Sequence, residues 1–380
     1  MWRLGVTPPA QTREPAAISA RMKAGAPLAP LFHSPDAEMP LTIRSICAAV
    51  VAGVVSLGSV PAAAQTAVLY GLLDASGSHV KDVGSRGQWQ LDSGNLQRSF
   101  IGVRGSDDLG GGLRAVFRLE SYLRVDSGNA GRASGDPFWS REASVGLSGQ
   151  FGTTVLGRTV SPLYSATISF NPFGESAGFS PSSRQYFGSR GVVVGDSRWD
   201  NSISYYNSAT DAPLRITFAA NLPEEAAGAP HAGRNYGGSI AYITGPFAAI
   251  VAVERIKNSP LPVPAGFSRQ VAIQVGATYD FTILRVYGQV GRVETNADID
   301  DQAILYQLGA AVPIGNSLIL ASYGNSHLKS SVRGVTSRIL SIGYDYFLSK
   351  NTDIYVAAML EKLSFVSSGN TFASGVRMRF

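Results

Sequence analysis

Alternation of apolar and polar positions is the main pattern along residues 65–380, and it is clearest in the last nine residues. One face of this segment is apolar and the other carries arginine. The apolar face holds Phe372, Val376, Met378 and Phe380, and the opposite face holds Ala373, Gly375, Arg377 and Arg379. A soluble sandwich would turn its charged face outward. A strand that is apolar on one side and cationic on the other instead favours a barrel with lipid outside and water inside.

The same period of two recurs through the chain, and no stretch is convincingly helical over three turns. Seven tight turns are predicted at Asp107–Gly112, Gly149–Gly152, Asn207–Pro213, Thr244–Pro246, Asp280–Thr282, Pro313–Asn316 and Ser349–Asn351. Eight longer connections alternate with them, at about 81–93, 126–136, 160–197, 223–234, 258–268, 295–300, 328–334 and 366–370. Fifteen connections join sixteen strands. The pattern therefore predicts an all-β protein, a transmembrane antiparallel β-barrel of about 16 strands, wide enough for an aqueous lumen.

One predicted connection, residues 160–197, is far longer than an ordinary loop. Such loops are usually functional or disordered. This one carries five aromatic residues, which are too many for a solvated tail. They are Phe170, Phe173, Phe179, Tyr186 and Phe187. We expect the loop to fold into the barrel lumen.

The N-terminal part divides into two segments before the barrel at 65–380. Residues 39–64 have the parts of a cleaved signal peptide: Arg44, an apolar core from Ile46, and a small-residue exit at Ala64. A single membrane anchor is the alternative. Residues 1–38 show no periodicity, and a well-formed signal peptide begins at Met39. We interpret 1–38 as an upstream extension that is not translated or not structured, and place the start at Met1 or Met39.

Composition narrows the function classes. The sole cysteine, Cys47, lies in the signal core, so the exported part has no thiol for a disulfide, a metal or a nucleophile. The formal charge is +5 for the whole chain. Without residues 1–64 it is +3, because 27 Lys and Arg and 24 Asp and Glu are left. The arginines are scattered along strands, which argues against nucleic acid. The exported part has three histidines, His79, His231 and His327, and they show no metal-ligand spacing. We expect that the protein binds no metal or cofactor and is not an enzyme.

Several motifs together resemble the trimeric general porins of Gram-negative bacteria, which are 16-stranded outer-membrane diffusion channels. The hairpin Ser99–Glu120 closely resembles the second hairpin of these porins. The other matching segments are Arg141–Leu147, Phe151–Arg158, Arg198–Tyr205, Gly343–Tyr355, Tyr70–Asp74 and the terminal Phe380. The resemblance covers essentially all of residues 65–380, with motifs in the family's order.

The resemblance implies that the third long loop narrows the lumen and that its acids face a ladder of wall arginines. Asn171–Glu175 resembles the tip of that loop. Two departures stand out: Phe100 occupies the usual place of a ladder arginine, and the loop has only two acids. Arg98, on the same strand face as Phe100, and Arg104 are expected to compensate. The constriction and pore-lining candidates are Arg98, Arg104, Arg118, Arg141, Arg158, Glu175, Arg190 and Arg198.

The predicted function is passive diffusion of small hydrophilic solutes and inorganic ions through an outer-membrane channel. Strand faces add polar lumen candidates at Arg118, Gln274, Arg285, Gln289, Arg377 and Arg379. Four arginines against two acids within residues 158–198 predict weak anion preference. The expected partners are outer-membrane lipid, lipopolysaccharide and two further copies in a homotrimer. A substrate-specific anion or sugar channel, and a non-conducting barrel that acts as a surface adhesin, remain open alternatives.

Overall fold

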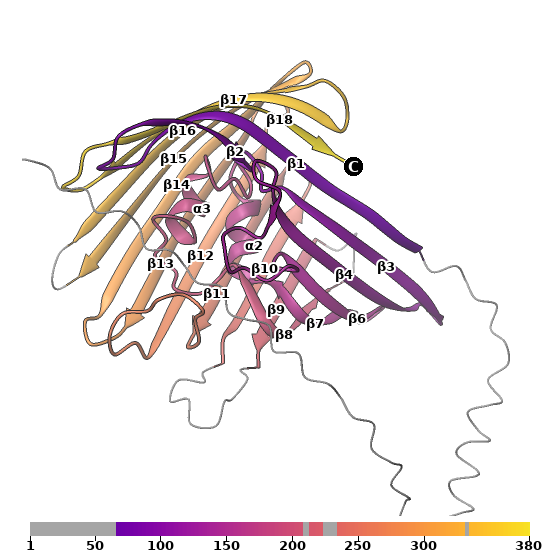
Figure 1. The fold of residues 1–380 in the computed structure, drawn as a ribbon. Coiled ribbons are helices and arrows are strands. Elements are labelled where there is room, and N and C mark those ends of the chain that lie inside the picture. Colours follow the sequence, from indigo (N-terminus) through magenta and orange to yellow (C-terminus); the bar gives the residue numbers. More distant parts are fainter. Residues whose placement is uncertain (1–65, 208–212, 223–233, 331–333) are drawn as a thin grey trace, which may run out of the picture. The chain divides into compact units, whose positions relative to one another are not determined.

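The computed structural model describes residues 66–207, 213–222, 234–330 and 334–380, and its strands form one closed antiparallel sheet (Figure 1). Sixteen strands build the barrel: β1 (Thr66–Lys81), β3 (Phe100–Gly110), β4 (Leu113–Arg124), β6 (Glu142–Gly149), β7 (Gly152–Val160), β8 (Arg198–Tyr206), β9 (Leu214–Asn221), β10 (Tyr236–Thr244), β11 (Phe247–Ile256), β12 (Arg269–Asp280), β13 (Arg285–Asn296), β14 (Asp301–Ile314), β15 (Ser317–Ser330), β16 (Val335–Phe347), β17 (Thr352–Leu363) and β18 (Gly369–Arg379). Two short strands complete the sheet: β2 (Gln88–Ser93) pairs with β1 on the same edge as β3, and β5 (Asn129–Ala130) pairs with the end of β4. The predicted fold class and strand number are confirmed. The predictions for residues 1–65 lie outside the described residues.

Strand β1 closes the barrel because it pairs on both of its edges. Residues 72–81 pair with β18, where Leu72 faces Arg379, and residues 66–72 pair with β3, where Leu72 faces Phe100. The backbones of Gly71 and Phe380 exchange hydrogen bonds of 3.0 and 3.2 Å at the seam. Closure leaves none of the described barrel strands with an unpaired edge, which is what a sheet in lipid requires, since hydrocarbon offers no partner for a free N–H or C=O.

The two faces of the wall differ as the alternation predicts. On β18, Phe372 is 47% exposed whereas its neighbour Ala373 is fully buried. On the cross-strand pair of β16 and β17, Leu340 and Leu360 are exposed side by side on the outer face. The inner face carries buried polar side chains such as Gln274. Because a slip of one residue would exchange the faces, this contrast fixes the register of every strand.

Short turns and long connections alternate around the barrel, as predicted. The turn from β3 to β4 holds three glycines, Gly110 to Gly112, all at positive φ, a conformation that residues with a Cβ rarely adopt. Five other predicted tight turns are also found. Part of the seventh, at 208–212, lies outside the described residues, as do 223–233 and 331–333 within two long connections.

The long connection between β7 and β8, residues 161–197, contains two short helices, α2 (Pro162–Ser169) and α3 (Pro181–Tyr186), which Figure 1 shows inside the ring of strands. Each helix begins at a serine N-cap followed by proline, which suits the unpaired first N–H groups. Neither helix, nor any other in the described part, is long and apolar enough to span a bilayer. We call residues 161–197 the inner loop.

The segment between β1 and β3 differs from the prediction. A connection was expected at about 81–93, but residues 88–93 form β2, which pairs with β1, and residues 94–99 interrupt the wall strand before β3. Arg98 was predicted to share a strand face with Phe100. That placement is wrong, because Arg98 lies in this interruption before β3 begins.

Candidate functional site

The inner loop is anchored to the inner face of the wall through helix α2. The carboxylate of Glu254 on β11 accepts the backbone N–H of Leu163 at 2.7 Å. The Thr167 hydroxyl donates to Gln274 at 2.8 Å, and Gln289 donates to the Thr167 carbonyl at 3.0 Å. All of these wall side chains are buried. The two predicted lumen glutamines therefore act as supports of the loop.

The second half of the inner loop is held by an ion-pair cluster and an amide. Glu361 on β17 accepts from Arg184 at 3.0 Å and from Arg190 at 2.7 Å. Gln185 donates to the Ser337 carbonyl at 3.0 Å. Arg190, predicted as a constriction residue, thus braces the loop against the wall in this structure.

The tip of the inner loop reaches the wall on the side of β3 and β6. Glu175 accepts from Arg141 at 3.1 Å and from Gln97 at 3.0 Å, while Arg141 also lies 2.9 Å from Glu120. Burial disfavours the charge of Glu175, but Arg141 and Arg198 outweigh it and hold the pKa of this carboxyl below its usual range. Glu175 at the loop tip and Arg141, which directly precedes β6, thus form an ion pair.

A cluster of ion pairs around Asp196 joins the inner loop to the connection before β6, and we call this cluster the latch. Arg132 donates to both carboxylate oxygens of Asp196, at 2.7 and 3.0 Å, and also contacts Asp136 at 3.0 Å. Arg158 lies 3.3 Å from Asp196 and 2.6 Å from Asp200. Although burial opposes ionisation, the hydrogen bond from Arg132 lowers the pKa of Asp196 to about 2. Arg158 is therefore a bracing residue of this latch.

The remaining predicted arginines have three different environments. Arg118 pairs with Glu142 at 3.2 Å, and Arg198 is buried, donating to the Arg141 carbonyl at 2.7 Å and to the Tyr122 hydroxyl at 3.2 Å. Arg98 lies 5.9 Å from the ring centre of Tyr122, and Arg104 lies 4.8 Å from that of Tyr70. Among the described residues, no carboxylate forms an ion pair with Arg98, Arg104 or Arg198.

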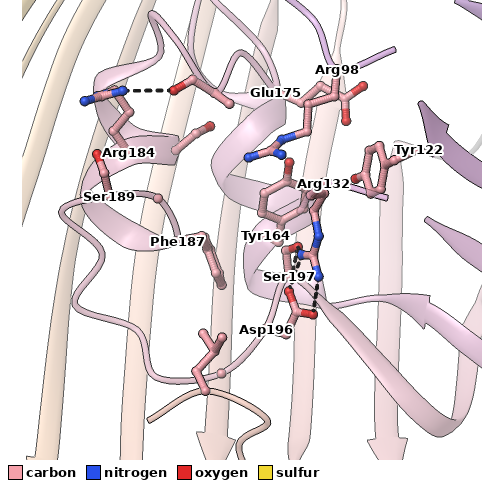
Figure 2. A pocket seen from close by; sticks show the side chains of 15 residues that line it. Arg98, Tyr122, Arg132, Tyr164, Glu175, Arg184, Phe187, Ser189, Asp196 and Ser197 are labelled. Atoms are coloured by element: carbon pink, nitrogen blue, oxygen red, sulfur yellow. Dashed lines mark hydrogen bonds and ion pairs between the residues drawn. The ribbon is translucent and has the colours of Figure 1, made fainter. Parts of the chain in front are cut away.

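A cavity of about 230 Å³ lies between the inner loop and the wall (Figure 2). Figure 2 shows Arg98, Arg132 and Arg184 around it, together with Tyr164 and Glu175. A second cavity, of about 220 Å³, is also lined by Glu175, together with Asp345 and Arg377. Glu175 thus lies where the two cavities approach each other at the loop tip.

Sequence reasoning missed several residues that build this site. Arg132 was assigned to a plain polar connection, and Glu120, Tyr122 and Glu361 were not considered as partners of the arginines. Glu120 and Glu361 sit on polar strand faces, so alternation alone could have placed them inward. Arg132 offered no such signal, because its role depends on how its connection folds. Within the described ranges, no three His, Cys, Asp or Glu side chains gather into a group that could hold a metal ion.

A closed antiparallel barrel with an apolar exterior, a polar interior and a loop packed inside it defines an outer-membrane β-barrel channel. A family model for Gram-negative porins matches residues 48–364 of the chain. The protein therefore belongs to the Gram-negative porin family and is located in the outer membrane.

Individual relatives agree with this assignment. Outer membrane porin protein 32 of Delftia acidovorans is 31% identical over 77% of this chain and 83% of its own length. An outer membrane porin protein of Bordetella pertussis is 25% identical over 84% of this chain and 95% of its own. Among solved structures, the anion-selective porin from Comamonas acidovorans superposes with a TM-score of 0.72 at 26% identity, covering 83% of this chain and all of that one.

Proposed function

We propose that the channel carries small hydrophilic solutes and ions by passive diffusion, with a weak preference for anions and without a catalytic step. The preference for anions over cations is inferred from one observation. Arg98 and Arg104 lie on the inner side of the wall, and neither forms an ion pair with any described carboxylate. Unpaired guanidinium groups along a water path favour anions. The 26% identical porin from Comamonas acidovorans is described as anion-selective, which supports the same sign.

The proposed constriction comprises the eight residues expected from the sequence, with two kinds of role. Arg98, Arg104, Arg118, Arg141 and Glu175 would set the field that a passing ion meets, because they line cavities or form the contact at the loop tip. Arg158, Arg190 and Arg198 would act through bracing, since each is engaged with the inner loop or its ends.

The preference should be modest. Two unit charges about 4 Å apart in water interact by roughly 1 kcal/mol, and about 1.4 kcal/mol corresponds to a tenfold ratio. Salt weakens the effect, because the screening length is about 8–10 Å near physiological ionic strength. We expect a chloride-to-potassium permeability ratio of a few-fold that falls as salt rises.

The reversal potential of the refolded protein in a planar bilayer under a KCl gradient tests the proposal. The double variant Arg98→Gln/Arg104→Gln should lose most of the anion preference. The control Arg338→Gln/Lys362→Gln removes two positive charges from the outer face and should leave it unchanged. Cation preference of the wild type would overturn the proposed sign, and a folded protein without conductance would overturn the channel.

The 230 Å³ cavity favours a second candidate, a channel with a binding step for a small organic anion. Guanidinium groups of Arg98 and Arg184 lie around it with the rings of Tyr164 and Phe187. Such a lining combines charge with apolar surface, as ligand sites commonly do. Block of the chloride current that saturates as benzoate is added, with no such saturation by chloride itself, would support this reading. Block that rises linearly with benzoate concentration would refute it.

We also propose a homotrimer in the membrane. On the outer side of β2, Trp89 and Leu91 are 75% and 77% exposed, more than most apolar side chains of the wall. Large exposed apolar side chains of this kind mark interfaces. Mass measurement in detergent should give three copies, and Trp89→Ser/Leu91→Ser should shift the distribution toward monomer. A monomeric wild type would refute the trimer.

A further proposed partner is the phosphorylated lipid of the outer leaflet, lipopolysaccharide. Arg338 and Lys362 are directly opposed on β16 and β17, both are exposed, and no described residue forms an ion pair with either. Like charges facing each other destabilise a sheet unless an anion lies between them. They stand one step beyond the exposed pair Leu340 and Leu360, toward the long connections that face outward in such barrels. Retention of lipopolysaccharide through purification should fall in Arg338→Gln/Lys362→Gln, and unchanged retention would refute the site.

A further inference from the structure

The wall strand formed by β2 and β3 is interrupted by an insertion of four residues. Ser93 faces Ala75 of β1, and further along the same edge Phe100 faces Leu72. Six residues, 94–99, therefore stand opposite only two residues of β1. A four-residue excess is even, so β3 resumes with its side chains on the same faces as those of β2. We call residues 94–99 the inner turn.

The inner turn projects to the side of the sheet that holds the inner loop. Its Leu96 is 5% exposed and belongs to one buried cluster with Phe173 and Phe179 of the inner loop. The carbonyl of Asn95 accepts from the Gly178 N–H at 3.2 Å and from the Ser176 hydroxyl at 2.7 Å. The tip of the inner loop thus rests on the inner turn and not on a flat wall.

One buried carboxylate holds the shape of the inner turn. Asp74 on β1 is fully buried, and its Oδ2 accepts the backbone N–H groups of Leu96 at 2.9 Å and Gln97 at 2.7 Å. Its other oxygen accepts from the Tyr355 hydroxyl at 2.7 Å. The backbone carbonyl of Asp74 also accepts the N–H of Gly94 at 2.9 Å, which closes the base of the inner turn. Two N–H groups that would otherwise be unpaired inside the wall are satisfied by a single side chain.

We propose that the inner turn is a second constricting segment of the pore and that Asp74 is its positioning residue. The inference rests on the proposed channel function and adds a determinant of pore size to it. The inner loop narrows the lumen from the wall of β9 to β16, where its helices pack. The inner turn narrows it from the wall of β1 to β3, and it presents Gln97 to the tip residue Glu175 and Arg98 to the 230 Å³ cavity. Width and charge of the pore are then both set where the two segments meet.

Deletion of residues 95–98 is the direct test, because it restores a continuous ladder in which Gly94 faces Asp74 and Phe100 still faces Leu72. A backbone segment is about 5 Å thick, so its removal should raise single-channel conductance by about half or more and admit larger sugars in liposome swelling. Arg98→Gln controls for the lost charge and should change ion preference without changing the size limit.

Two milder variants keep the proposal testable if the deletion does not fold. Asp74→Ala removes the acceptor of both N–H groups and should widen the size limit, whereas Asp74→Asn retains an acceptor oxygen and should stay near wild type. A Cβ at Gly178 would lie 2.8 Å from the Asn95 carbonyl, so Gly178→Ala should push the loop tip away from the inner turn. Gly288→Ala, where a Cβ meets nothing within 4 Å, is its control.

The outcomes separate the inference from the channel function. A wild type that conducts, together with folded deletion, Asp74→Ala and Gly178→Ala proteins that keep wild-type conductance and size limit, would overturn the inner turn as a constriction. A folded wild type that does not conduct would overturn the channel itself. Folding of each variant is judged by its far-ultraviolet circular dichroism and by the mobility of the unheated protein in gels.

Discussion

Substitution of Glu175 by glutamine should make the channel more selective for anions. The variant removes one negative charge from the tip of the inner loop but keeps an amide that can still accept from Arg141 and Gln97. Arg141 remains paired with Glu120 at 2.9 Å, so the wall side of the contact should stay in place. The change is therefore close to a pure change of charge at the point where the two cavities approach.

The size of the effect follows from Coulomb's law. An ion that passes about 6 Å from the carboxylate in water interacts with it by roughly 0.7 kcal/mol, and the difference between an anion and a cation is about twice that. Screening at about 0.15 M salt leaves roughly half. The chloride-to-potassium permeability ratio should then rise about threefold, since about 1.4 kcal/mol is tenfold.

Reversal potentials under a KCl gradient, measured at two ionic strengths, provide the assay. Glu294→Gln is the matched control, because Glu294 pairs with Arg292 on the outward-facing row of β13 and lies away from the lumen. An unchanged or smaller anion preference in folded Glu175→Gln would refute the assignment of Glu175 to the ion path. An equal shift in Glu294→Gln would show that general surface charge, and not the loop tip, is responsible.

Two further predictions concern the fastening of the inner loop. The pKa of Asp196 is about 2, below its usual 3.8, so its ion pairs stabilise the latch fully above pH 4 and are lost as the pH falls toward 2. Arg132→Gln should move that loss up toward pH 4, as measured by hydrogen exchange of residues 190–197; exchange with the wild-type pH dependence would contradict it. Glu254→Ala should leave the Leu163 N–H unpaired, at a cost of about 1–3 kcal/mol, whereas Glu254→Gln should not. Limited proteolysis of residues 161–197 reports the difference, and equal cleavage of both variants would count against this anchor.

The sequence predicts the wall far better than the interior. Alternation in β18 places Phe372 outward and Arg377 inward because a strand with lipid on one side has a single workable register. The aromatic residues of the inner loop, such as Phe173 and Phe179, correctly predict that it packs against other structure. These features are local in the chain, so a short window of residues contains the physical reason for each.

The contacts of the site are not local, and the sequence could not supply them. The partners Arg132 and Asp196 are 64 positions apart, and they meet only because two connections fold toward each other. The inner turn was missed for a related reason: a four-residue excess is visible only against the register of β1. Asp74 was noted only as the end of the segment Tyr70–Asp74, although its carboxylate holds two distant N–H groups.

The seam between β1 and β18 has a consequence for how the barrel is made. Leu72 of β1 pairs with Arg379 of β18, so β1 cannot complete its pairing until the last strand is available. Two sheet edges therefore stay open until nearly the whole chain is present. Pairing over such a separation makes folding slow, and exposed edges invite aggregation while it proceeds. We therefore expect the unfinished protein to need chaperones that cover both edges on its way to the membrane, and we expect their supply, before the stability of the finished barrel, to limit its yield in cells.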